Sequence, residues 1–335
     1  MARAIVGHPR IAPHIFGKRR ECAILAYHRV TSRKAYPVPF DPNRSIAVHR
    51  DAFEAQLRHL SQNMKCLSMD ELIGDLERGA VQPQTVTLTF DDGYADNLVH
   101  ALPLLEKYKV PATVYITTEL LNGAVKAWWY ELEDIVLARN EIELCLSGHS
   151  FRKRTETFQE KDSVYNEIAA VFKSLPSPEL KEGMRMLRVG PIAPSREEIQ
   201  FLSDGQLQQL ARSPWITIGA HTVSHPSLSS LSKDRALEEL QRSKVHLEQL
   251  LGRPVVHCAY PFGLPAHANT REYTLAREAG YASAVTTVFG RVSSGEVTSR
   301  WSLPRLHIDY DDSLGDFRYK IAGAALARRG GWYAQ

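Results

Sequence analysis

Two adjacent carboxylates, Asp91 and Asp92, follow directly after the apolar, β-branched segment 86–90. Segments of this length and composition are typical of buried strands, and Gly93 allows the chain to turn sharply where the strand ends. Neighbouring like charges repel each other, and a buried carboxylate without a partner is costly. The pair therefore indicates either a bound cation or a solvent-exposed turn, and this segment alone does not decide between them.

Two histidines, His221 and His225, lie four residues apart after a second strand-like segment at 215–218. Two imidazoles and one carboxylate form a mixed nitrogen and oxygen ligand set that suits Zn²⁺ or a similar divalent ion and leaves coordination positions open. A single histidine near a strand end is usually structural. Two at this spacing, together with the carboxylate pair, favour a metal site over a surface turn.

Three motifs in this order resemble the first three motifs of the polysaccharide deacetylases, the NodB-homology or carbohydrate esterase 4 family. They are Thr89-Phe-Asp-Asp-Gly93, His221-Thr-Val-Ser-His225-Pro226 and Ala259-Tyr-Pro-Phe-Gly263, and the resemblance covers about residues 22–310. The Tyr-Pro-Phe-Gly segment resembles the branch that acts on bacterial exopolysaccharides. The resemblance implies a hydrolase of linear amides that removes the N-acetyl group of an amino sugar in a glycan or glycan precursor.

The resemblance also implies a role for each site residue. Asp91 would be the general base, and the metal ligands would be Asp92, His221 and His225. The metal would be Zn²⁺, with Co²⁺, Mn²⁺ and Ni²⁺ as alternatives. The substrate and the reaction oxyanion would lie at Tyr260, Pro261 and Phe262, with the Phe262 backbone N–H stabilising the oxyanion.

The departing amine needs a proton, for which a histidine is suited at neutral pH. His28, which follows Tyr27, resembles the donor of the exopolysaccharide branch and is the preferred candidate. His307 resembles more loosely the late Leu-x-His motif of other members and is the second candidate. The third motif lacks the arginine that orients the base in many members, so the sequence leaves the orientation of Asp91 unexplained.

Strand-like and helix-like segments alternate along most of the chain, as in parallel βα units. Strands are expected at 22–27, 86–90, 112–117, 215–218, 255–259 and 282–286. The candidate site residues follow the carboxyl ends of such strands, so a parallel barrel would gather them at one rim. We therefore predict an α/β fold, a distorted parallel (β/α) barrel of the NodB-homology type.

The chain divides into three predicted parts. Residues 1–21 form an N-terminal extension, 22–310 the deacetylase domain, and 311–335 a C-terminal helical tail. The alternation of strands and helices breaks at about 121–200, which predicts an inserted, mostly helical segment at one rim. Its aromatic segment 128–130 fits the core packing of an amphipathic helix better than a platform for sugars.

The composition indicates which partners and which cellular compartment to expect. A net charge of +3 over 335 residues is too mild to indicate nucleic-acid binding. Neither a secretory signal nor an apolar run of about 18 residues is found, so we expect a cytoplasmic protein without a transmembrane segment. A contact of 18–20 with the inner membrane face is the weaker alternative. The 4 cysteines are widely spaced and are expected to be buried thiols.

Two other functions stay open. The same chemistry could act on another acyl group or on a lipid-linked sugar, because early glycan intermediates are built on the cytoplasmic side. A catalytically idle carbohydrate-binding homologue is the alternative from another class. Asp91 beside the predicted ligands argues against it, since a binding protein has no need of a base.

Overall fold

The protein is described here by a computed structural model, which covers residues 20–32, 39–146, 148–193, 199–293 and 300–322. Its centre is a closed ring of parallel strands in the order β1 (Glu21–Tyr27), β13 (Leu303–His307), β11 (Ser283–Phe289), β10 (His257–Ala259), β9 (Ile216–Ala220), β6 (Ala112–Ile116) and β5 (Thr85–Phe90). The ring closes because β1 pairs in parallel with both β13 and β5. The predicted parallel barrel is confirmed.

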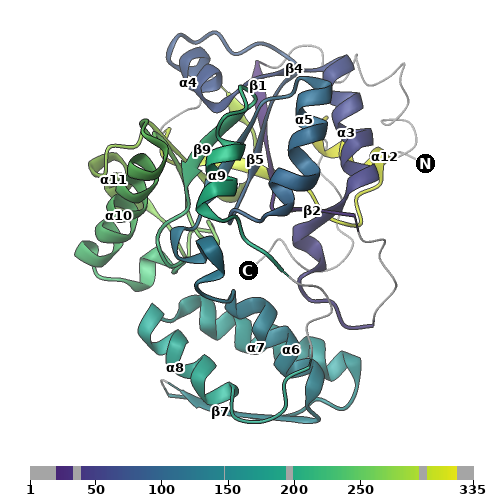
Figure 1. Cartoon of the computed structure of the whole chain (residues 1–335), viewed down its shortest axis with the longest axis vertical. Coiled ribbons are helices and arrows are strands. Elements are labelled where there is room, and N and C mark those ends of the chain that lie inside the picture. The colour runs from purple at the N-terminus through teal and green to yellow at the C-terminus, as the bar shows by residue number, and fades with distance from the viewer. Residues whose placement is uncertain (1–19, 33–38, 147, 194–198, 294–299, 323–335) are drawn as a thin grey trace.

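Helices cover the outside of the ring (Figure 1). They are α3 (Arg50–Asn63), α4 (Met69–Glu77), α5 (Leu102–Tyr108), α9 (Asp204–Leu210), α10 (Lys233–Leu251), α11 (Thr270–Glu278) and α12 (Leu314–Ile321). Ser68 and Ser203 form capping boxes at the starts of α4 and α9. With helices outside and side chains inside, every residue of β5 and β6 is buried.

Shorter elements complete the barrel. The sheet is extended beside β5 by β4 (Lys65–Cys66) and beside β1 by β12 (Val292–Ser293). A separate pair is formed by β2 (Arg29–Thr31) and β3 (Ala47–His49). Short segments of 3₁₀ helix lie at Arg44–Ile46, Thr118–Gly123 and Leu228–Ser230. A π-helical turn, Asn97–Ala101, leads directly into α5.

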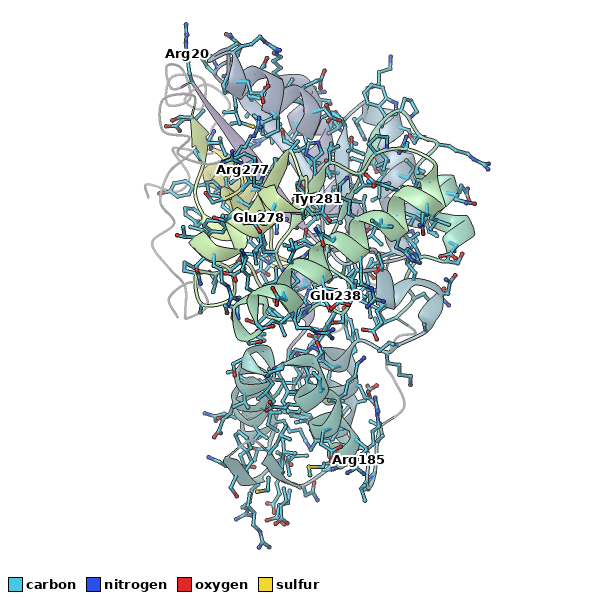
Figure 2. All side chains as sticks on the ribbon, turned by 90° about the vertical axis from the view of Figure 1, so that its left-hand side faces the viewer. Arg20, Arg185, Glu238, Arg277, Glu278 and Tyr281 are labelled. Carbon is cyan, nitrogen blue, oxygen red and sulfur yellow. The ribbon has the colours of Figure 1, made fainter. Side chains whose placement is uncertain are left out.

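The segment predicted as an insertion forms a lobe at one end of the barrel (Figure 1). It contains α6 (Trp128–Ala138), β7 (Glu141–Leu146), β8 (His149–Arg154), α7 (Phe158–Ser174) and α8 (Ser177–Leu187). Figure 2, which labels Arg185 in the lobe and Glu238 on α10, shows this lobe beyond the barrel helices. Trp128 and Trp129 are buried in the lobe's own hydrophobic cluster, as expected for core residues.

Two features of the lobe differ from expectation. Strand β8 was not predicted, because its sequence is mostly polar and basic; the antiparallel pairing with β7 forms it. Strand β7 alternates exposed and buried residues, and Cys145 falls on its exposed face. The prediction of buried thiols is therefore wrong for Cys145, whereas Cys22 and Cys258 are buried and Cys66 is half-buried.

The ends of the chain are described in part. Residues 1–19 of the predicted extension and 323–335 of the predicted tail lie outside the described residues, and α12 forms the described part of the tail. Within the described ranges, no helix combines the length and the apolar character that crossing a bilayer requires.

Gly219 of β9 provides a test of how tightly the barrel is packed. An added Cβ would lie 2.6 Å from Tyr115 Cε1 and 3.0 Å from the His257 carbonyl oxygen. Because Tyr115 is fully buried, it has little room to move. We expect Gly219→Ala to reduce the free energy of unfolding by about 1–3 kcal/mol, measured by urea denaturation.

Gly205→Ala is the matched control for this substitution. Gly205 lies in α9, and nothing lies within 4 Å of an added Cβ there. Its urea midpoint should stay level or rise slightly, since alanine favours a helix. Equal midpoints for the two variants would contradict a closely packed barrel at Gly219.

Candidate active site

The predicted metal ligands meet at the carboxyl-end rim of the barrel. Asp92 follows β5, and His221 and His225 follow β9. Asp92 Oδ1 lies 3.5 Å from His221 Nε2 and 3.3 Å from His225 Nε2. One ligand atom from each of the three residues lies within 4.8 Å of the other two. Strand order thus brings together residues that are far apart in the sequence.

The chemistry of these atoms fits a bound cation. His221 Nδ1 lies 2.8 Å from the Ala259 carbonyl oxygen, which can only accept, so Nδ1 carries the proton and Nε2 presents its lone pair. Burial lowers the pKa of His221 to about 4, so the ring is neutral. Asp92 Oδ1 is buried without a well-formed hydrogen bond and faces this lone pair. A divalent cation would satisfy both acceptors.

The backbone around the site is held in an uncommon conformation. Positive φ angles occur at Asp92 (75°), Thr222 (64°), His225 (56°) and Phe262 (60°). Such angles are rare for residues other than glycine, above all for a β-branched threonine. They persist only where surrounding contacts impose them, and they concentrate at functional sites.

Glu239 of α10 supplies such contacts to the loop between the two histidines. Its Oε2 accepts hydrogen bonds from the Val223 and Ser224 backbone N–H groups, each at 2.9 Å. Its Oε1 accepts from Ser224 Oγ at 2.9 Å. Three bonds to one carboxylate hold the loop, and the sequence carries no local signal for them, because Glu239 lies on the following helix.

Arg305 of β13 orients the predicted base. Its Nη1 donates to Asp91 Oδ1 at 2.8 Å and its Nη2 to Asp91 Oδ2 at 2.6 Å, a bidentate pair. Arg305 also donates from Nε to the Thr286 carbonyl oxygen at 2.7 Å. Both charged side chains are buried. Burial alone would raise the pKa of Asp91, but the guanidinium holds it well below its usual range, so Asp91 stays ionised.

The two candidate proton donors lie together at the ends of neighbouring strands, with His28 directly after β1 and His307 the last residue of β13. The ring centroids of His28 and His307 are 5.8 Å apart. His307 Nε2 lies 3.1 Å from the Ser45 carbonyl oxygen and therefore donates to it, and burial lowers the pKa of His307 to about 3. His28 Nδ1 is buried and has no hydrogen-bond partner in the described part of the chain.

The residues of the third motif have two locations: Tyr260 lies in the core, and Phe262 lies at the site. Tyr260 is buried, and its hydroxyl donates to the Trp301 carbonyl oxygen at 2.8 Å, so its side chain is a core residue. The Phe262 ring packs edge-on against His225, with ring centroids 4.8 Å apart. Pro261 precedes it in a tight turn, in which the Gly263 N–H donates to the Pro261 carbonyl oxygen at 2.7 Å. Among the described residues, nothing accepts a hydrogen bond from the Phe262 N–H.

Comparisons with known proteins identify the family of the chain. The sequence model of the family described as polysaccharide deacetylase matches residues 78–177 and 196–284, more than half of the chain. The chain belongs to the polysaccharide deacetylase family. The family match is interrupted at 178–195, within and after α8 of the lobe.

Individual relatives resemble parts of this chain. A poly-beta-1,6-N-acetyl-D-glucosamine N-deacetylase of Staphylococcus aureus is 33% identical over 110 residues, which are 30% of this chain. The matched region spans 37% of that relative's length.

Solved structures share the fold over nearly the whole chain. The Streptococcus pyogenes deacetylase PplD in complex with acetate gives a TM-score of 0.59 at 21% identity, over 90% of this chain and 98% of that one. IcaB from Ammonifex degensii gives a TM-score of 0.57 at 18% identity, over 92% of this chain and 97% of that chain. At this level of identity the likeness shows the deacetylase fold alone.

The sequence analysis missed Arg305 as a partner of the base. Arg305 and Asp91 are 214 positions apart, and only the closed ring of strands brings them together. The signal in the sequence was the absence of an arginine from the third motif of this chain. That absence required another buried cation beside Asp91, and Arg305 stands two residues before the candidate His307.

We expect Arg305→Lys to lower kcat about 10²-fold with little change in KM. Lysine keeps the charge but cannot hold both carboxylate oxygens, and a small displacement of a reacting group can cost about that much. Steady-state measurement of acetate release checks the rate, and the thermal midpoint checks folding. Arg300→Lys, at a half-exposed arginine that pairs with Glu77, is the control. A wild-type kcat in Arg305→Lys would contradict the orienting role.

Proposed function

We propose that this protein is a metal-dependent N-deacetylase that hydrolyses the N-acetyl amide of an amino sugar in a glycan or glycan precursor. One observation carries the proposal: the ionised carboxylate of Asp91, fixed by Arg305, stands directly beside a separate cluster of three ligand atoms. Metal-dependent amide hydrolysis uses both, a base for water and a Lewis acid for the carbonyl.

Asp92, His221 and His225 would hold the metal ion. Two imidazole nitrogens and one carboxylate oxygen suit Zn²⁺ first, and they also suit Co²⁺, Mn²⁺ and Ni²⁺. When bound, the ion supplies a Lewis acid that polarises the amide carbonyl and acidifies water.

Asp91 would accept a proton from the attacking water. Its pair with Arg305 keeps the carboxylate ionised and its oxygens in one orientation. The Phe262 N–H, which has no acceptor among the described residues, would donate to the oxygen of the tetrahedral intermediate. A donor of this kind is worth about 10² to 10³ in rate.

His28 would give a proton to the departing amine. His307 is the weaker candidate, because its low pKa keeps the ring neutral and its Nε2 proton is bonded to the Ser45 carbonyl oxygen. His28 keeps a buried ring nitrogen, Nδ1, that has no hydrogen-bond partner among the described residues.

The substrate is proposed to be an N-acetylglucosamine-type glycan or its precursor, since a named relative acts on poly-beta-1,6-N-acetyl-D-glucosamine. A lipid-linked precursor remains a predicted alternative substrate. The location is predicted to be cytoplasmic, with a contact at the inner membrane face as the alternative. The unpaired state of all four cysteines supports a reducing compartment. The complete set of Asp91, Asp92, His221, His225 and Arg305 argues against a catalytically idle homologue.

The metal assignment predicts that a chelator abolishes acetate release and that added Zn²⁺, Co²⁺ or Mn²⁺ restores it. The His221→Ala, His225→Ala double variant should lose bound metal, as measured by elemental analysis after dialysis.

The Asp91→Asn variant should retain the metal, but its kcat should fall about 10²- to 10⁴-fold, because the substitution removes only the base. Full metal content in the double variant, or normal turnover in Asp91→Asn, would overturn the assignment.

The acid assignment predicts different effects at the two neighbouring histidines. His28→Ala should keep metal and substrate binding but lose kcat, because proton donation matters mainly in the transition state. The alkaline limb of the pH–rate profile, which reflects loss of the acid's proton, should change in this variant. His307→Ala is the matched comparison and should have a milder effect. A severe loss in His307→Ala with near-normal His28→Ala would reverse the assignment.

A further inference from the structure

A pocket between the barrel and the lobe opens beside the candidate metal site. The space in it that protein atoms do not fill is about 700 Å³ and includes open solvent. The barrel contributes His225 and Phe262 to its lining, and the lobe contributes Trp128, Leu180 and Met184. The pocket is thus continuous with a predicted ligand of the metal.

The walls of this pocket favour an apolar occupant. Its apolar lining includes Leu120, Val125, Phe172, Leu175, Leu180 and Met184. Several of its polar side chains already have partners within the protein: Lys181 with Glu119 at 2.8 Å, Arg188 with Glu131 at 2.7 Å, and Ser177 with Ser224 at 3.1 Å. Sugar hydroxyls placed there would lose hydrogen bonds to water and regain few, which costs free energy. An alkyl group would lose none.

The position of the pocket around the ring indicates which part of the substrate enters it. Its barrel residues follow β6, β9 and β10, whereas His28 and His307 lie at β1 and β13, across the ring. The departing amine must face its proton donor. With His28 as the donor, the sugar lies on the β1 side, and the acyl carbon chain extends toward the pocket.

We propose that this pocket is a subsite for the N-acyl group, and that the protein hydrolyses N-acyl amino sugars with chains longer than acetyl. The inference rests on the proposed function, because it uses the same base, metal ligands and proton donor. Water adds across the amide C–N bond, its oxygen goes to the acyl carbon, and the amine leaves with a proton. The products are a fatty acid and the free amino sugar, and no other reactant is needed.

A series of N-acyl glucosamines that differ only in chain length tests the subsite. N-acetyl, N-butanoyl and N-hexanoyl glucosamine are incubated with the metal-loaded full chain, and the released primary amine is measured. Each methylene that is buried should raise kcat/KM about fourfold, from the transfer free energy of a CH₂ group. The longer chains should therefore be better substrates than acetyl.

Leu180→Phe narrows the pocket on its lobe side. The variant should lower kcat/KM for the hexanoyl substrate relative to that for the acetyl substrate about tenfold or more, because two or more methylenes can no longer be buried. Met186→Phe is the matched control: it lies on the same helix, is 40% exposed and does not line the pocket. Its ratio should equal that of the wild type.

The possible failures can be told apart. If kcat/KM is independent of chain length or falls with it, and Leu180→Phe does not change the ratio, the acyl subsite is overturned while acetate release still supports the deacetylase. If the folded, metal-loaded protein releases amine from none of these substrates or from N-acetylated oligosaccharides, both the subsite and the proposed function are overturned.

Discussion

The ion pair between Arg305 and Asp91 links the closure of the barrel to the orientation of the base. Neither charge could be buried alone, since an unpaired buried ion costs several kcal/mol. The guanidinium reaches the carboxylate only because β13 lies beside β1 and β1 lies beside β5. Thr89 Oγ1 and the Thr286 carbonyl oxygen accept further N–H groups of Arg305 at 3.0 and 2.7 Å, so the buried cation is well satisfied. The site geometry therefore depends on the complete ring.

This pair also explains why two adjacent aspartates can have different roles. The charge of Asp91 is compensated by Arg305 within the protein. The charge of Asp92 faces two imidazoles, one of which presents a lone pair because its other nitrogen donates to Ala259. One carboxylate thus has a fixed protein cation, and its neighbour still requires one. This unequal compensation supports the proposed division of roles, with Asp91 as the base and Asp92 as a metal ligand.

The parts of the site that the sequence predicts are those encoded locally. Asp91 and Asp92 follow a recognisable strand and precede a glycine, and His221 and His225 belong to one short segment. Arg305 was missed as the partner of Asp91 because its contact depends on the pairing of strands distant in sequence. Its own strand was also obscure: Pro304 has no backbone N–H to donate, and the pairing of β11 with β13 is irregular.

Glu239 and strand β8 were missed for related reasons. Glu239 is one of several acidic residues on an amphipathic helix, and nothing in its spacing marks the one that turns toward the loop. The polar sequence of β8 forms a strand because β7 supplies the pairing partner. In each case the deciding contact comes from a neighbouring element, so the propensity and periodicity of the segment itself do not reveal it.

The segment 40–46 connects the lobe with the proton donors. Phe40 packs in the lobe's hydrophobic cluster, and Asn43 donates to Glu133 of α6 at 2.7 Å and accepts from the Tyr165 hydroxyl of α7 at 3.0 Å. A few residues later, the Ser45 carbonyl oxygen accepts the Nε2 proton of His307. The segment that docks the lobe therefore also engages one of the two candidate donors. Because His307 is held in this way, the contact supports His28 as the proposed donor to the amine, and the lobe that lines the proposed acyl pocket contributes to that preference.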